Sequence, residues 1–117
     1  LKGLAHITGG GITDNLPRIL PRGCGAEIRV GSWPVLPVFD LIARLGKVPE
    51  EDMFRTFNMG VGMLLVVDKE DSDPVIRSLQ KRREKFYKMG CVTRGRRSVR
   101  YERARSHEAG LHGEGRA

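Results

Sequence analysis

Three consecutive glycines near the start of the chain are the residues best suited to bind an anion. Gly9, Gly10 and Gly11 follow an apolar run that predicts a strand, and a helix is expected to begin after them. Glycine backbone adopts positive φ angles and approaches a ligand closely, and the first turn of a helix offers free N–H groups to a phosphate. The spacing matches neither the dinucleotide-binding fingerprint nor the P-loop. Phosphate binding and a plain tight turn therefore both remain open.

The helix after these glycines needs a start signal. Thr13 or Asp14 is expected to cap it by accepting a hydrogen bond from a free backbone N–H group. Pro17 suits a helix only in the first turn, where its missing N–H is not needed. These signals place the start of the helix beside the glycines.

A second pair of glycines lies in the middle of the chain. Gly60 and Gly62 interrupt the start of an apolar run whose second half, residues 63–67, predicts a strand buried on both faces. Glycine within a strand usually marks a bulge or a group lying close to the backbone. That group is either the strand that leads into the first glycine turn or a ligand, and both alternatives remain open.

The remaining pattern predicts helices alternating with strands. Residues 26–30 alternate apolar and charged side chains, as in a strand with one face in water. Helices are expected at 37–45 and 49–57, and a longest helix from Pro74 up to Gly90 with Asp73 as its cap.

The end of the pattern predicts a hairpin. Strands at 91–93 and 98–101 are expected to pair through the arginine-rich link 94–97. The whole order predicts an α+β fold, a mixed α/β sandwich in which helices cover a sheet and the strands 4–8 and 63–67 are the most buried.

Apolar side chains at helical spacing predict which faces pack in the core. Trp33 is interpreted as a core residue in preference to a base-stacking one. The two longer helices are expected to bury Val38, Phe39, Ile42 and Leu45 in the first case and Val75, Ile76, Leu79 and Phe86 in the second.

The net charge of +7 is unevenly distributed. Up to Ile76 there are 8 Lys and Arg against 10 Asp and Glu, and from Arg77 onward 13 against 4. The basic charge therefore belongs to the last helix and the tail, where a solvated face is favoured over a nucleic-acid groove. No specific nucleic-acid partner is expected.

Cysteine and histidine usage predicts neither a disulfide framework nor a metal site. Cys24 and Cys91 are too few and too far apart in sequence, and two reduced thiols suit a cytoplasmic protein. His107 and His112 lie in a glycine-rich tail and form no cluster with the cysteines. No apolar run approaches the length of a membrane span.

Four sequence blocks follow one another at compatible separations, at residues 6–11, 15–21, 31–34 and 55–63. Together they resemble the carboxy-terminal domain of the phosphoribosylformylglycinamidine cyclo-ligase family, also called aminoimidazole ribonucleotide synthetase. The resemblance covers residues 1–102, which would be the substrate-side domain, incomplete at its start. Residues 103–117 are expected to be a basic, disordered tail.

The resemblance implies an ATP-dependent ligase of purine biosynthesis. Such an enzyme converts formylglycinamidine ribonucleotide and ATP to aminoimidazole ribonucleotide, ADP and phosphate, with Mg²⁺. It implies that ATP and Mg²⁺ bind mainly to an amino-terminal domain that also forms a homodimer in the cytoplasm. The present chain would supply one wall of the cleft and would be inactive alone.

The resemblance also implies which residues line that cleft. Thr8 and the three glycines would donate hydrogen bonds to phosphate oxygens, and His6 would be a donor or proton carrier, unless it is a hydrogen-bonded core residue. The remaining candidates are Asn15 and Arg18 near the helix start, and Asn58, Gly60 and Gly62 on the neighbouring strand. The alternatives are that Asn15 only caps the helix and that Arg18 is only an exposed residue. Thr13 and Asp14 depart mildly from the usual apolar–acidic pair, and the long basic tail departs from the usual end.

Two other classes of function remain as alternatives. The first is a related kinase domain of the same superfamily, of the selenophosphate, thiamine-phosphate or hydrogenase-maturation type. The second is a non-enzymatic module that binds nucleic acid through residues 77–105, whose affinity would fall steeply with salt.

Overall fold

The computed structural model describes residues 1–103 of the chain, so the expected tail lies outside the described residues except for Arg103. Helices and strands alternate, as the sequence pattern predicts, and the α+β class is confirmed. The strands are β1 (Gly3–His6), β2 (Cys24–Val30), β3 (Met63–Val66), β4 (Gly90–Arg94) and β5 (Val99–Arg103). The helices are α1 (Gly11–Asn15), α2 (Pro37–Gly46), α3 (Glu50–Thr56) and α4 (Ser72–Lys81), with short 3₁₀ helices at Leu16–Ile19 and Lys69–Asp71.

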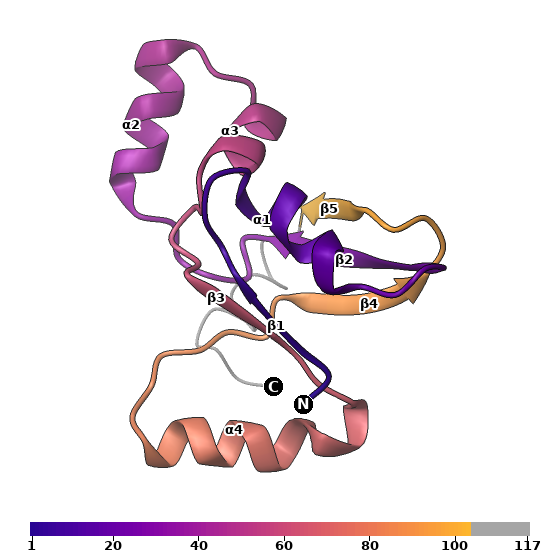
Figure 1. Cartoon of the computed structure of the whole chain (residues 1–117). Helices are drawn as coiled ribbons and strands as arrows, with labels where there is room; N and C mark the ends of the chain where they lie inside the picture. The colour runs from indigo at the N-terminus through magenta and orange to yellow at the C-terminus, as the bar shows by residue number, and fades with distance from the viewer. Residues whose placement is uncertain (104–117) are drawn as a thin grey trace.

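The strands form two separate sheets instead of one. β1 and β3 pair antiparallel, while β2 is the central strand of the order β4-β2-β5, antiparallel to β4 and parallel to β5. Figure 1 shows α2 and α3 at one end of the molecule and α4 at the opposite end. Within residues 1–103, no helix has the length and apolar content needed to cross a bilayer.

The predicted hairpin between β4 and β5 is wrong, because β2 lies between the two strands. The link between them passes close over the start of β2. A side chain at Gly25 would place its Cβ 2.4 Å from the carbonyl oxygen of Arg96. Ala26 N–H also donates to Ser98 O at 2.9 Å. The link thus hydrogen-bonds to a strand some 70 residues earlier, and no local turn signal predicts such a pairing.

The predicted extension of the last helix to Gly90 is also wrong. α4 begins at Ser72, with Asp71 and not Asp73 as its cap residue, and it ends at Lys81. Arg83 adopts a φ of 57°, Glu84 N–H donates to Leu79 O, and Arg83 N–H donates to Gln80 O. This bond pair is the Schellman ending, which glycine normally forms. A non-glycine residue in that conformation is why sequence reasoning placed the helix end too late.

The strands expected to be the most buried have one exposed face. The inner face of the sheet formed by β1 and β3 buries Ala5 and Ile7, whereas Leu4, Met63 and Leu65 on the outer face are 51%, 52% and 39% exposed. Burial on both faces needs a layer on each side, and residues 1–103 supply only one.

The core lies between the inner face of this sheet, β2, α1 and α3. Trp33 is buried as predicted, and its indole N–H donates to Met59 O at 3.1 Å while its ring meets the edge of Phe54. Met53 and Phe54 are buried. On α2 the prediction is only half right: Phe39 and Ile42 pack against the core, but Val38 and Leu45 are exposed. The predicted inner residues of α4, and Phe86 beyond it, are only partly buried.

Candidate functional site

The glycine turn joins β1 to α1, with positive φ angles of 97° at Gly10 and 62° at Gly11. Gly10 is the cap residue, and no side chain in the described part of the chain makes a capping hydrogen bond. The prediction that Thr13 or Asp14 caps this helix is therefore wrong. The physical reason is that the helix begins at Gly11, which places both residues inside it. Pro17 lies at the start of the following 3₁₀ helix, where a missing N–H is tolerated.

Gly11 is required by packing. A Cβ at this position would lie 2.0 Å from the carbonyl oxygen of Phe54 and 2.6 Å from that of Phe57. The turn therefore lies directly against the end of α3. The N–H of Gly11 already donates to Thr8 O at 3.0 Å, so this amide closes the turn.

Asn15 lies behind the turn and determines the orientation of its peptide groups. The side chain is buried, and its Nδ2 donates to the carbonyl oxygens of Thr8, Gly9 and Gly11 at 3.3, 3.2 and 2.8 Å. Its Oδ1 accepts from the Thr8 hydroxyl at 3.4 Å. The sequence candidate Asn15 is thus turned toward the turn's own carbonyls.

The amides of Gly9 and Gly10 point to the other side of the turn. In a planar trans peptide the C=O and N–H point in opposite directions, and residues 1–103 contain no cis peptide. The Thr8 and Gly9 carbonyls point at Asn15, so the N–H groups of Gly9 and Gly10, in the same two peptide planes, point away from it. Among residues 1–103 neither N–H forms a hydrogen bond. A Cβ at Gly9 would have no atom of residues 1–103 within 4 Å, so Gly9 is open where its side chain would stand, whereas a Cβ at Gly10 would lie against Asp14.

The two charged residues that follow the turn in sequence have opposite signs. Asp14 is exposed, and its carboxylate lies over Gly10, 2.9 Å from where a Cβ would stand. Arg18, on the next 3₁₀ helix, is exposed and makes no ion pair within the described residues. An anion at the turn would thus be repelled by Asp14.

His6 is exposed at the end of β1, opposite Met63 of β3. It is on the face opposite Ala5 and Ile7, so the alternative of a core histidine is wrong. Two residues, Ile7 and Thr8, separate it from Gly9, and its side chain is exposed.

The second glycine segment lies beside the first. Ile7 N–H donates to Gly62 O at 2.9 Å, which joins the end of β1 to the residue before β3. Met59 and Gly60 both have positive φ, as in a type I′ turn, and Asn58 Oδ1 accepts from Gly60 N–H at 2.8 Å. The strand beside Gly62 is therefore β1, which is one of the two alternatives that the sequence left open. No atom of residues 1–103 would lie within 4 Å of a Cβ at Gly62.

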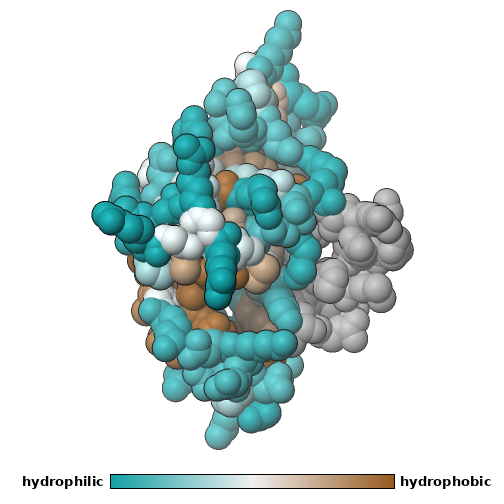
Figure 2. All heavy atoms as spheres, turned by 90° about the vertical axis from the view of Figure 1, so that its right-hand side faces the viewer, coloured by the Kyte–Doolittle hydropathy of each residue, from teal (hydrophilic) through white to brown (hydrophobic). Residues whose placement is uncertain are grey.

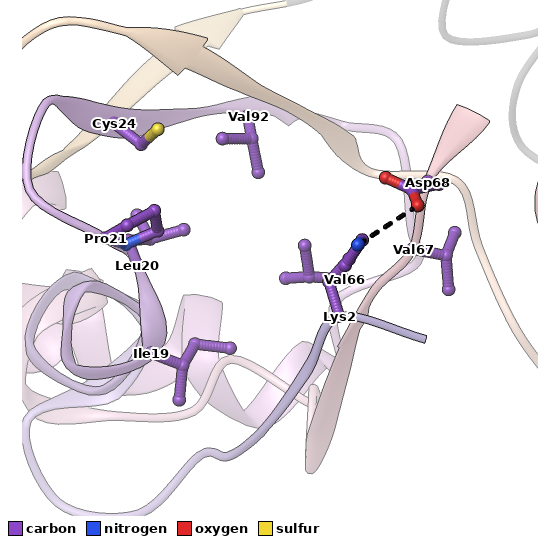
Figure 3. A pocket seen from close by; sticks show the side chains of 9 residues that line it. All are labelled: Lys2, Ile19, Leu20, Pro21, Cys24, Val66, Val67, Asp68 and Val92. Atoms are coloured by element: carbon purple, nitrogen blue, oxygen red, sulfur yellow. Dashed lines mark ion pairs between the residues drawn. The ribbon is translucent and has the colours of Figure 1, made fainter.

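A cavity of about 340 Å³ lies away from these turns, at the far end of the β1–β3 pair. Figure 2 shows a recess bordered by hydrophobic residues on the side of the molecule that carries β4. Figure 3 shows the cavity wall, with a single ion pair between Lys2 and Asp68 at 3.4 Å. The other lining residues are Ile19, Leu20, Pro21, Cys24, Val66, Val67 and Val92. None of the residues that line the cavity belongs to either glycine turn. The candidate site is therefore the pair of free N–H groups of Gly9 and Gly10, and not the cavity.

Sequence reasoning missed one contact beneath the turn. The hydroxyls of Thr13 and Tyr101 are 2.8 Å apart, and Thr13 Oγ1 also donates to Phe54 O at 3.3 Å. Burial raises the pKa of Tyr101 above its ordinary value, while the Thr13 hydrogen bond acts in the opposite direction. The two residues are 88 positions apart, so no spacing rule relates them.

The second sheet carries an ion pair of its own. Arg100 of β5 bonds Glu27 of β2 at 2.5 Å, and this bond lowers the pKa of Glu27. Within residues 1–103 there is no group of three or more His, Cys, Asp or Glu placed to hold a metal ion.

Comparison with known proteins identifies the family. Residues 1–102 match the family described as AIR synthase related protein, C-terminal domain. The chain is 52% identical over 101 residues to a phosphoribosylformylglycinamidine cyclo-ligase of Brevibacillus brevis, which covers 86% of this chain and 29% of that protein. It is 55% identical over 95 residues to a cyclo-ligase of a Geobacillus strain, covering 81% and 28%.

A third relative has a different overall length. A bifunctional purine biosynthetic protein of Dictyostelium discoideum is 45% identical over 98 residues, which is 84% of this chain and 12% of that protein. The chain spans less than a third of the length of these relatives. The resemblance inferred from the four sequence blocks is confirmed, and the chain belongs to the AIR synthase related family as a C-terminal domain.

Proposed function

We propose that this chain is part of an ATP-dependent ligase of purine biosynthesis. In the proposed reaction formylglycinamidine ribonucleotide is cyclised to aminoimidazole ribonucleotide, and ADP and phosphate are released. The proposal is supported by the cyclo-ligase names of relatives that are about half identical to the chain. The chain would form one wall of the cleft and hold a phosphate at the glycine turn.

The orientation of the Gly9 and Gly10 amides is the observation that carries the proposal for this site. Asn15 bonds the carbonyls of two successive peptides, and this leaves the two N–H groups pointing away from Asn15, without a hydrogen-bond partner among residues 1–103. Adjacent N–H groups pointing the same way form an anion-binding concavity. Because Asn15 fixes them before a ligand arrives, binding costs little reorganisation.

The other candidates surround this pair of amides. Thr8 and Gly11 complete the turn, and Arg18 would supply the positive charge that offsets Asp14. His6 would act as donor or proton carrier from the exposed end of β1. The segment from Asn58 through Gly60 to Gly62 would border the same cleft from the neighbouring strand.

The nucleotide would bind elsewhere in the complete enzyme. ATP supplies the phosphoryl group that activates the formyl oxygen, with Mg²⁺ to neutralise charge. Residues 1–103 lack a group of side chains that could hold a metal ion by themselves. In this proposal an amino-terminal domain outside the present sequence binds ATP and Mg²⁺ and forms a cytoplasmic homodimer.

A chimera tests the proposal. The 101 residues of the Brevibacillus brevis protein that match this chain are replaced by their counterparts here, and turnover of formylglycinamidine ribonucleotide with ATP is measured. We expect activity, and we expect Asn15→Leu in the chimera to lower kcat/KM by about tenfold or more. Gln80→Ala on the exposed side of α4 is the control and should have no effect. A folded chimera without turnover would contradict the proposal.

A further inference from the structure

We propose that Tyr101 on β5 is a positioning residue for the glycine turn, acting through Thr13. This inference rests on the proposed function of the turn. It adds a role for β5, the strand that carries Tyr101, in holding the glycine turn and its amides in position.

Tyr101, Thr13 and Gly11 all lie close to the carbonyl oxygen of Phe54 or to the group bonded to it. Phe54 O accepts from Thr13 Oγ1, and the same oxygen lies against Gly11, where a Cβ would be 2.0 Å away. The Tyr101 hydroxyl lies 2.8 Å from Thr13 Oγ1, and its ring packs on the Phe54 ring at a tilt of 32°, with centroids 4.5 Å apart. Tyr101 therefore contacts both Thr13 and Phe54, the two residues that are bonded at the carbonyl oxygen against Gly11.

The arrangement leaves little freedom in the hydroxyl pair. A threonine hydroxyl has one proton, and here that proton is directed to Phe54 O. Thr13 must then accept from Tyr101, whose own proton has this one partner among the described residues. Removing the tyrosine hydroxyl leaves Thr13 free to rotate away from Phe54, and the start of α1 loses its fixed distance to α3.

A second contact, an ion pair, also holds β5 against α3. Arg103 at the end of β5 forms an ion pair with Glu50 at the start of α3. β5 is thus fastened to the two helices that enclose the turn, α1 through Thr13 and α3 through Glu50. The exposed ion pair contributes little by itself, so the hydroxyl pair is the contact to test.

The first experiment needs no ligand. Amide hydrogen exchange is measured by NMR in the 117-residue chain and in Tyr101→Phe. The N–H groups of Gly11 and Asp14 bond Thr8 O and Gly10 O inside the turn, and we expect their exchange to accelerate about fivefold. The N–H of Arg29, bonded to Met89 O, is the reference for global opening. Equal acceleration at Arg29, or none at Gly11, would overturn the proposal.

The second experiment links the contact to binding. Inorganic phosphate is titrated into the wild-type chain, Tyr101→Phe, Thr13→Val and the double variant, with Gly9 and Gly10 amide shifts as the readout. Each single variant should weaken binding about fivefold, and the double variant no further, because the two hydroxyls act as one unit. Tyr87→Phe and Thr93→Val are matched controls, since neither hydroxyl forms a hydrogen bond within residues 1–103.

The two experiments separate the two proposals. If wild type binds no phosphate at the turn, the proposed function of the turn fails, while the exchange rates still decide the role of Tyr101. If phosphate binds equally well to wild type and Tyr101→Phe, the positioning role is wrong and the anion site stands.

Discussion

The side-chain amide of Asn15 lies 2.8 Å from the carbonyl oxygen of Gly11, four residues earlier, and bonds the Thr8 and Gly9 carbonyls at the same time. One buried side chain thus replaces the water that these carbonyls would otherwise need. As a result, the carbonyl acceptors of the turn face Asn15, and the N–H donors of Gly9 and Gly10 point away from it. This division is what makes a glycine-rich turn suited to an anion.

Asn15→Leu should lower both stability and phosphate binding. The leucine keeps the approximate volume but removes the side-chain donor from three carbonyls, of which Thr8 O keeps its bond from Gly11 N–H. This loss should cost about 1–3 kcal/mol in the free energy of unfolding. Urea denaturation measures the first effect and an NMR titration the second. Asn58→Ala, which removes a single bond to Gly60 at a half-exposed position, should cost clearly less. Equal losses would contradict the role assigned to Asn15.

Gly11→Ala and Gly9→Ala should differ strongly in stability. The methyl group at Gly11 would meet two backbone oxygens, and the residue would keep an unfavourable positive φ, so a loss above about 2 kcal/mol is expected. At Gly9 the added methyl has open space, and the change should stay within about 1 kcal/mol. Denaturant midpoints of the two variants decide. Substitution at Gly10, as in Gly10→Val, should remove activity, but its φ of 97° and the contact with Asp14 would also strain the fold.

Asp14→Asn should strengthen phosphate binding. The carboxylate lies over Gly10, and removing its charge should raise affinity about threefold at low salt, with a smaller gain as salt increases. Asp40→Asn on α2, where Asp40 pairs with Arg44, is the control and should leave the affinity unchanged. Weaker binding in Asp14→Asn would indicate that the carboxylate assists the anion, for example through a shared cation, and not that it repels it.

Tyr101 should make the fold sensitive to alkali. Its pKa in the folded state is raised above 10.0, mainly by burial and also by Asp14, while Thr13 and Arg55 lower it. A raised pKa means that the fold prefers the neutral phenol. This contribution is fully present below the unfolded pKa of Tyr and is lost as the pH rises through the folded pKa. Thermal unfolding from pH 8 to 11 should therefore show a steeper loss of stability in wild type than in Tyr101→Phe, and parallel curves would refute the assignment.

Elements set by local signals could be predicted from the sequence. β2, α2 and α3 lie where alternation, proline and first-turn acids place them. The pairing of β4 and β5 with β2 could not be predicted, because it depends on Gly25 and the link over it, which are distant in sequence. The end of α4 was missed because Arg83 adopts a conformation that composition does not reveal.

The candidate site, too, could be predicted from the sequence only in part. A run of three glycines identifies the turn, but only the structure separates Gly11, which packs on Phe54, from Gly9, whose Cβ would contact no described atom. The structure also places the Asn15 side chain against the carbonyls of the turn and the Tyr101 hydroxyl against that of Thr13. The sequence predicted that β1 and β3 are the most buried strands, but their outer face is exposed. A continuous apolar run predicts burial on both faces without identifying the element that packs on each face.

The most direct test of the central claim is a titration of the ¹⁵N-labelled chain with inorganic phosphate, with sodium chloride as the ionic-strength control. The account predicts saturable shifts that are largest at the Gly9 and Gly10 amides and small at Gly11, whose N–H is already bonded to Thr8 O. Shifts confined to the arginine-rich segment 94–97, or shifts at the turn that chloride reproduces, would contradict it.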